Sequence, residues 1–98
     1  MATEEKIEVE NVNHPGQVSN VNAAKYHAMK TALLKVLPKS SPGLTQREMI
    51  DHSKAQLPEA LFPGGATAGW WVKCVQLDLE AKGTVLRDNG KPLRWTKT

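Results

Sequence analysis

Apolar residues recur every three or four positions in three separate segments of the chain, which is the spacing of an amphipathic α-helix. The first segment, residues 22–37, carries its apolar positions at Tyr26, Met29, Leu33, Val36 and Leu37. Asn22 is a residue type that caps helix N-termini, and Pro38 cannot continue a helix. The pattern therefore predicts a helix that begins after Asn22 and ends at about Leu37.

The second segment opens with the signature of a capping box. Thr45 and Glu48 stand three residues apart, so each side chain can accept a hydrogen bond from the backbone N–H of the other. We expect a helix that reaches about Gln56 and turns Met49 and Ile50 inward. The proline- and glycine-rich connector that follows should place Leu61 and Phe62 in the core.

The third segment, residues 67–82, is apolar around most of its circumference. It has two apolar stripes, formed by Val72, Val75 and Leu79 and by Trp70, Cys74, Leu77 and Ala81. A helix of this kind usually packs between several neighbours. We therefore expect the central helix here, with Thr67 as its N-cap and Gly83 as the left-handed residue that ends it.

Two adjacent tryptophans lie in the first turn of this third helix. Neighbouring helix positions point about 100° apart, so one face of the helix cannot bury both rings in the same way. We expect Trp71 to lie in the core with the stripe that contains Val75 and Trp70 to be exposed or half-exposed.

The C-terminal residues 84–95 predict a β-hairpin. Asn89-Gly90 is the preferred dipeptide of a two-residue type I′ turn. A turn centred there sets Arg87 opposite Pro92 in a pair without ladder hydrogen bonds, where the missing N–H of proline costs nothing. In this register the inner face carries Leu86, Leu93 and Trp95, and the outer face carries Arg87 and Arg94.

The N-terminal residues 1–19 form an acidic arm. Four glutamates and one lysine give the arm a net charge of −3, whereas the 12 basic and 6 acidic residues of positions 20–98 give +6. Ile7 and Val9 alternate with glutamates, which leaves open a short edge strand, for which the C-terminal hairpin would supply the pairing edge. Residues 13–20 are typical of a turn or loop. The sequence leaves open whether the arm is flexible or partly ordered.

Three helices followed by a β-hairpin is the order of elements in winged-helix proteins. The segment LEAKGTVLRDNGKPLRW resembles the helix-to-wing junction of bacterial winged-helix regulators at Leu79, Gly83, Val85 and Arg87. The stretches GLTQREM, LFPGG, GWWVK and VQLDLEAKG are similar to a small bacterial family of uncharacterised single-domain proteins. The resemblances imply an α+β, winged helix-turn-helix domain over residues 20–98, and they bring no assigned activity.

The sequence carries no recognisable catalytic or metal-binding pattern. The three histidines, at positions 14, 27 and 52, lack metal-ligand spacing. Cys74 lies on an apolar stripe, which favours an inert buried thiol over a nucleophile. The spacing from Gly64 to Gly69 fits a phosphate-binding loop, but Trp70 and Trp71 replace its Lys-Ser/Thr. We therefore expect a non-enzymatic protein without a cofactor.

Composition favours a cytoplasmic protein that does not enter a membrane. The single cysteine of the chain cannot form an internal disulfide, which fits a reducing compartment. The acidic start of the chain lacks the apolar core of a secretory signal. No apolar run approaches the roughly 20 residues that span a bilayer.

Two binding functions remain open, and the sequence slightly favours the first. The first is weakly selective binding of double-stranded DNA, in which the basic wing contacts phosphates and the third helix adds limited groove contacts. Its candidate residues are Arg87, Lys91, Arg94 and Lys97 in the wing and Lys73 and Gln76 on the helix, with Lys25, Lys30 and Lys35 as additional cations. The second is a protein partner or homodimer bound through the exposed aromatic region of Trp70, Phe62 and Leu61.

Overall fold

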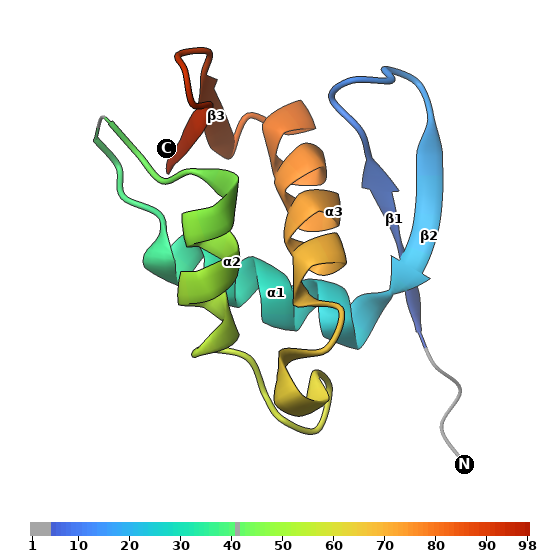
Figure 1. The fold of residues 1–98 in the computed structure, drawn as a ribbon. Coiled ribbons are helices and arrows are strands. Elements are labelled where there is room, and N and C mark those ends of the chain that lie inside the picture. The colour runs from blue at the N-terminus through green and yellow to red at the C-terminus, as the bar shows by residue number, and fades with distance from the viewer. Residues whose placement is uncertain (1–4, 41) are drawn as a thin grey trace.

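Three helices and two separate antiparallel β-hairpins make up the chain in a computed structural model that describes residues 5–40 and 42–98 (Figure 1). The protein is therefore α+β. In chain order the elements are β1 (Lys6–Glu10), β2 (Val18–Asn22), α1 (Ala23–Val36), α2 (Gln46–Lys54), a short 3-10 turn (Pro63–Gly65), α3 (Ala68–Ala81), β3 (Val85–Asp88) and β4 (Arg94–Lys97).

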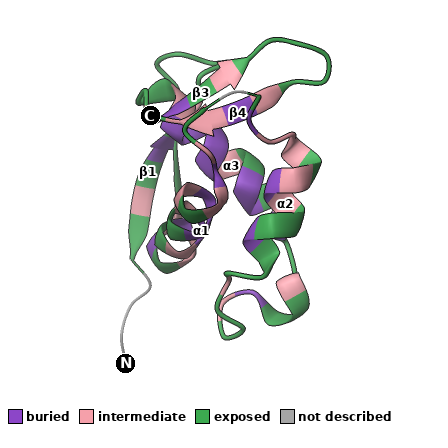
Figure 2. Cartoon of the chain, turned by 90° about the vertical axis from the view of Figure 1, so that its left-hand side faces the viewer, coloured by how far each residue is buried: buried purple, intermediate pink, exposed green. Residues whose placement is uncertain are grey.

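The third helix is the central element, as its apolar circumference predicts. α1 and α2 pack against α3, and β1 runs along another side of it (Figure 1). Buried residues gather where these elements meet (Figure 2). The core includes Met29 and Leu33 of α1, Met49 of α2, and Val72 and Val75 of α3. Full burial of each such side chain stabilises the fold by about 1.5–3 kcal/mol.

The predicted caps hold for two of the three helices. The side chain of Asn22 accepts a hydrogen bond from the backbone N–H of Lys25 at 2.9 Å. Both bonds of the capping box form between Thr45 and Glu48, at 2.9 and 3.2 Å. Thr67 is the N-cap residue of α3, as predicted, but its side chain does not cap the helix, because the residue adopts φ 60° and its hydroxyl donates to the carbonyl of Ala66.

The two adjacent tryptophans separate as predicted. Trp71 is buried, whereas 59% of Trp70 is exposed. The interplanar angle of the two rings is 81° and their centroids lie 4.9 Å apart. Phe62 in turn packs edge-on against Trp71. The exposed ring of Trp70 therefore packs against the buried ring of Trp71, which in turn packs against Phe62.

The C-terminal hairpin forms, but its predicted two-residue turn and register are wrong. Asp88 pairs with Arg94 and Arg87 with Trp95, so the loop comprises residues 89–93. The prediction paired Asp88 with Lys91, so the observed pairing is shifted by three residues along β4. Because side chains alternate between the two faces of a strand, an odd shift places each residue of β4 on the opposite face from the one predicted. Trp95 is buried on the same face as Val85, whereas Leu86 and Leu93 are exposed.

The pairing of Leu44 with β4 explains the register. Leu44 and Trp95 exchange two backbone hydrogen bonds of 2.8 and 2.9 Å. Gly43 permits this approach, because it adopts φ +83° and a Cβ there would lie 2.4 Å from the carbonyl oxygen of Trp95. Tertiary contacts thus override the local preference of Asn89-Gly90.

The N-terminal strand pairs with a second N-terminal strand and not with the C-terminal hairpin, contrary to prediction. β1 and β2 form their own hairpin, in which Val9 pairs with Ser19. The segment from Val18 to Asn20, predicted as loop, therefore begins a strand. Val9 is buried and faces the core, and β1 is the strand nearer α3 (Figure 1).

Candidate functional site

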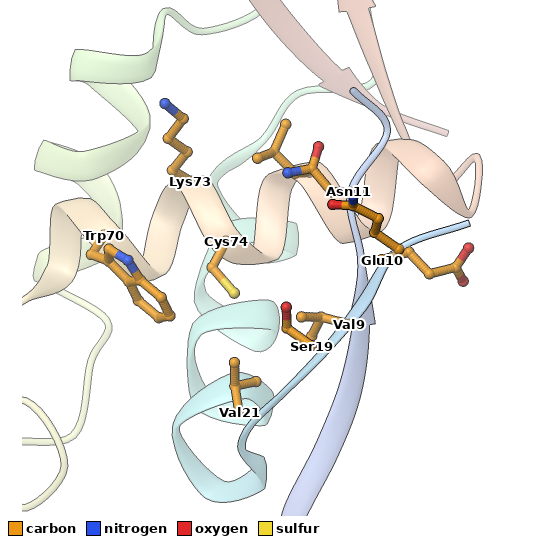
Figure 3. A pocket seen from close by; sticks show the side chains of 10 residues that line it. Val9, Glu10, Asn11, Ser19, Val21, Trp70, Lys73 and Cys74 are labelled. Carbon is orange, nitrogen blue, oxygen red and sulfur yellow. The ribbon is translucent and has the colours of Figure 1, made fainter. Parts of the chain in front are cut away.

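A cleft of about 250 Å³ lies between the N-terminal hairpin and α3 (Figure 3). Its α3 side comes from Trp70, Lys73, Cys74 and Leu77, and its hairpin side comes from Val9, Glu10, Asn11, Gln17, Ser19 and Val21. The lining combines apolar residues with polar ones. Of the lining residues, the sequence singled out Trp70 as an interface residue and Lys73 as a DNA contact.

Trp70 is the aromatic residue that lines the cleft. Its ring rests on Trp71, which is itself fixed against Phe62, so the exposed ring has a rigid support. Phe62 is only 1% exposed and Leu61 is half-buried. Phe62 therefore packs beneath Trp71, Leu61 packs against the core, and neither residue lines the cleft beside Trp70.

Cys74 lines the cleft as a protonated thiol. Burial raises the pKa of Cys74 from 9.0 to about 11, and the nearby carboxylate of Asp78 adds to the increase. A thiol with this pKa carries little thiolate near neutral pH, so its nucleophilicity is low. The side chain contributes apolar surface to the cleft and no recognisable catalytic group.

Asp78 joins the two sides of the cleft although it is fully buried. One carboxylate oxygen accepts the backbone N–H of Glu10 at 2.8 Å, and the other accepts the hydroxyl of Tyr26. The ammonium of Lys82 lies 2.7 Å from the same carboxylate and balances its charge. Burial raises the pKa of Tyr26, and its bond to Asp78 adds to this effect. The sequence pattern gave no signal for this network, because its members lie on three elements.

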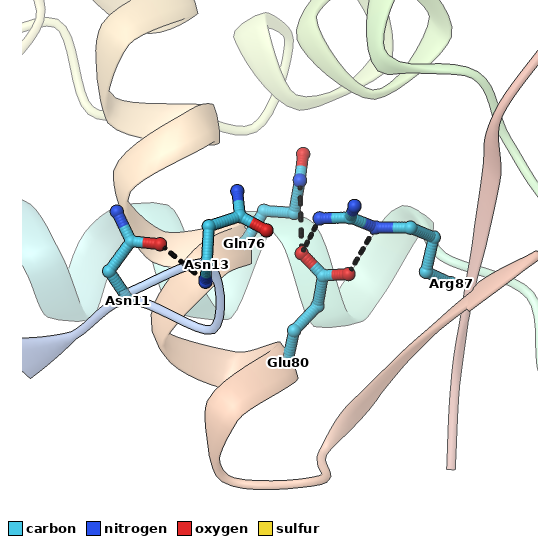
Figure 4. A network of polar contacts seen from close by, with 5 residues as sticks. All are labelled: Asn11, Asn13, Gln76, Glu80 and Arg87. Carbon is cyan, nitrogen blue, oxygen red and sulfur yellow. Dashed lines mark hydrogen bonds and ion pairs between the residues drawn. The ribbon is translucent and has the colours of Figure 1, made fainter. Parts of the chain in front are cut away.

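Arg87 and Gln76, two of the predicted DNA contacts, are held within the protein. The guanidinium of Arg87 binds both carboxylate oxygens of Glu80, at 2.7 and 3.0 Å, and this pairing raises the pKa of Arg87 (Figure 4). The amide of Gln76 donates to the same carboxylate at 3.2 Å, and Gln76 is buried. Arg87 also lies 5.7 Å from the ring centroid of Trp95. Its predicted place on the outer face of the hairpin is therefore wrong.

The remaining predicted DNA contacts do not form one surface. Arg94 is half-buried and donates to the carbonyl of Gly43 at 3.3 Å and to Glu48 at 3.5 Å. The ammonium of Lys97 donates to the carbonyl of Leu34. Only Lys73 and Lys91 of the six predicted residues are exposed, and they lie on α3 and in the loop after β3.

The three lysines of α1, predicted as additional DNA contacts, do not form a group of exposed charges with Lys73 and Lys91. Lys25 lies 6.0 Å from the ring centroid of Phe62, Lys30 is half-buried and Lys35 is exposed. All three arginines of the chain have acidic partners, because Arg47 also lies 3.5 Å from Asp51. Arg47 and its partner are both exposed, so the exposed positive charge comes from Arg47 and from lysines.

Within residues 5–40 and 42–98, no three His, Cys, Asp or Glu side chains are grouped so that they could hold a metal ion. The same residues include no helix with the length and hydropathy required to cross a membrane.

Comparison with known proteins identifies the family of the chain. No curated protein and no solved structure matches it. One family model matches residues 6–95, from the first strand to the buried tryptophan of the last. This match includes both hairpins and all three helices, and therefore also the whole cleft. The chain belongs to DUF6958, a family of unknown function.

Proposed function

We propose that this chain is a non-enzymatic protein-interaction module whose cleft accepts an apolar side chain of a partner protein against Trp70. The observation that carries the proposal is the 59% exposure of a tryptophan whose ring is fixed from below by Trp71. Exposed aromatic anchors with a rigid support are typical of interface hot spots, since they bury a large area at a small entropic cost.

The distribution of polar groups in the cleft supports this function. Val21, Cys74 and Leu77 offer apolar surface, and the rim has Glu10 and Lys73. Protein interfaces commonly combine an apolar centre with a polar rim that gives orientation and specificity.

The arrangement of the framework is consistent with a winged helix. β4 lies between β3 and the single bridging residue Leu44, after the helix order α1, α2 and α3. In winged-helix regulators the third helix enters the major groove of DNA, which is about 12 Å wide. Here β1 runs along α3, and Trp70 and Lys73 are its exposed residues at the cleft. These features favour protein over base edges as the ligand.

Weak DNA binding is the second candidate, favoured by the exposed positions of Lys73 and Lys91. Each lysine that neutralises a phosphate contributes about −0.9 to the log–log slope of affinity against salt. With Arg87 and Arg94 held within the protein, we expect a shallow slope and no preference for sequence.

Selection from a random peptide library displayed on phage tests the protein-interaction function. We expect selected peptides to share an apolar residue and to lose at least about tenfold in affinity for Trp70→Ala, the range expected for a hot spot. Leu86→Ala, at another exposed apolar residue, should leave their affinity unchanged. Failure to select any peptide, or equal affinity for wild type and Trp70→Ala, would contradict the proposal.

Titration of the protein with random-sequence duplex DNA across a salt series tests the second candidate. Binding that weakens in Lys73→Ala and Lys91→Ala would support DNA as a ligand. Absence of binding at low salt would exclude duplex DNA as a ligand.

A further inference from the structure

We infer that the free edge of β2 pairs antiparallel with β2 of a second copy of this chain, so that the two N-terminal hairpins form one four-stranded sheet across a two-fold axis. This inference goes beyond the proposed function, because it assigns a second surface, next to the Trp70 cleft, and a different partner.

The hydrogen-bond pattern of the hairpin shows which backbone groups of β2 are available. The N–H of Ala23 donates to the carbonyl of Glu5 at 2.9 Å. Bonded pairs alternate with non-bonded pairs in an antiparallel ladder, so Val9 and Ser19 form a bonded pair, and Glu8 and Asn20 point their N–H and C=O groups outward.

An independent contact supports this assignment of the ladder. Glu10 also belongs to a non-bonded pair, and its N–H points out of the hairpin to reach Asp78 at 2.8 Å. The edge of β1 therefore faces α3, whereas the opposite edge, at Val18 and Asn20, is exposed. Outside the β1–β2 ladder, no hydrogen bond of the described residues to another element or to a turn involves the backbone N–H or C=O of Val18 or Asn20.

The edge of β2 lacks the features that normally prevent strands from pairing. Its sequence, VSNVN, contains no charge and no proline, and Val18 is 57% exposed. Natural edge strands are usually protected by lysine or another charge, by proline or by a bulge. β1 and β3 follow this rule, since the former contains Lys6 and two glutamates and the latter contains Arg87 and Asp88.

Charge compatibility identifies a second copy as the occupant. A two-fold axis sets a strand against itself, so every charged residue near the axis would meet a like charge. Centred on Asn20, the pairing sets this residue against the partner's Asn20, and its amide can both donate and accept.

The glutamates of β1 do not oppose this pairing. The two β1 strands would lie three strand spacings apart, about 14 Å, which exceeds the Debye length of about 8 Å at physiological ionic strength. Repulsion between the glutamates of the two copies is therefore largely screened.

The same register also extends the cleft. Ser19 and Val21 line the cleft from the inner face of β2. Opposite Ser19, the two-fold pairing places the partner's Val21 on that same inner face. Dimerisation would therefore add an apolar residue to the hairpin wall of each cleft and bury the exposed edge of both copies.

Sedimentation velocity of the full chain over a range of concentrations tests the inference. We expect a dimer for the wild type, with a Kd of about 10–100 µM. Asn20→Lys should be monomeric, because two lysines would face each other across the axis. Asn89→Lys, which makes the same change of charge at an exposed position of the other hairpin, should remain dimeric.

A proline at position 20 tests the strand pairing itself, because it removes a backbone donor at the edge without adding a charge. Asn20→Pro removes an outward N–H that the β1–β2 ladder does not use, so it should give a folded monomer by far-UV circular dichroism. Should this variant unfold, the comparison of Asn20→Lys with Asn89→Lys still decides. A monomeric wild type, or an Asn20→Lys variant as dimeric as the wild type, would overturn the inference.

These outcomes are distinguishable from those of the proposed function. Trp70→Ala should lose the selected peptides and remain dimeric, whereas Asn20→Lys should become monomeric and still bind them, because one copy supplies Trp70 and the rest of the cleft apart from the partner's Val21.

Discussion

Tyr26 donates a hydrogen bond from its hydroxyl to the carboxylate of Asp78, across 52 positions of the chain. This bond joins α1 to α3, and the bond from Glu10 to the same carboxylate joins β1 to both. A buried carboxylate is tolerated because Lys82 balances its charge and two further groups donate to it. Together with the packing of Val9 in the core, this side chain therefore positions the N-terminal hairpin and shapes the cleft.

Loss of the Asp78 carboxylate should strongly destabilise the fold. Asp78→Ala leaves the buried hydroxyl of Tyr26, the part-buried N–H of Glu10 and the ammonium of Lys82 without their acceptor, and we expect a loss of about 3–5 kcal/mol in the free energy of unfolding. Tyr26→Phe removes one donor and should cost only about 1–2 kcal/mol. Urea denaturation of both variants measures the difference. A loss below 1 kcal/mol for Asp78→Ala, on the order of one ordinary hydrogen bond, would contradict the role of this residue.

The two adjacent tryptophans should respond very differently to substitution. Trp71→Ala removes a buried ring and should cost about 3–5 kcal/mol. Trp70→Ala removes a mainly exposed ring and should change stability by less than about 1 kcal/mol. Thermal unfolding of the two variants gives a direct comparison. Similar losses would mean that the exposed ring stabilises the fold and is not kept for a partner.

Arg87 should contribute to stability and not to DNA binding. Its pair with Glu80 is mainly buried, with side-chain exposures of 26% and 5%. We expect Arg87→Ala to cost about 2–3 kcal/mol, less than for a fully buried pair because the guanidinium is partly solvated. Its affinity for random duplex should equal that of the wild type. A loss of DNA affinity larger than that of Lys73→Ala would restore the basic wing as a binding surface.

Stability should fall at alkaline pH in part because of Cys74. Burial raises the pKa of this thiol in the folded protein from 9.0 to about 11. The folded state therefore binds the proton more tightly, and the resulting stability is complete below pH 9 and is lost as the pH rises toward 11. Urea midpoints measured from about pH 8 to 10 should fall more steeply for the wild type than for Cys74→Ala. Equal slopes would show that the thiol does not contribute.

The capping box should stabilise α2 measurably. Thr45→Ala removes the acceptor for the backbone N–H of Glu48 and should lower the free energy of unfolding by about 1 kcal/mol. Thr45→Ser keeps the oxygen and should restore most of this loss. Chemical denaturation checks both, and equal stability of the alanine and serine variants would argue against the cap.

The helices were predictable because their signals are local. Apolar spacing and the caps at Asn22 and Thr45 act within one or two turns, so the chain alone carries the information. The left-handed conformation of Gly83 after α3 was equally predictable. For the candidate site, the same local geometry distinguished Trp70 from Trp71, since adjacent helix positions cannot share one buried face.

The strands and the walls of the cleft depended on contacts between distant residues. Asn89-Gly90 favours a two-residue turn, but burying Val85 together with Trp95 and pairing Leu44 with β4 requires another register. The strand β2 has little alternation of its own and forms because β1 supplies its hydrogen bonds. The sequence by itself determined where helices begin and end and which tryptophan is exposed. Strand register, the use of Arg87 within the fold and the cleft beside α3 were decided only by tertiary structure, because a strand completes its hydrogen bonds with residues that its own sequence does not specify.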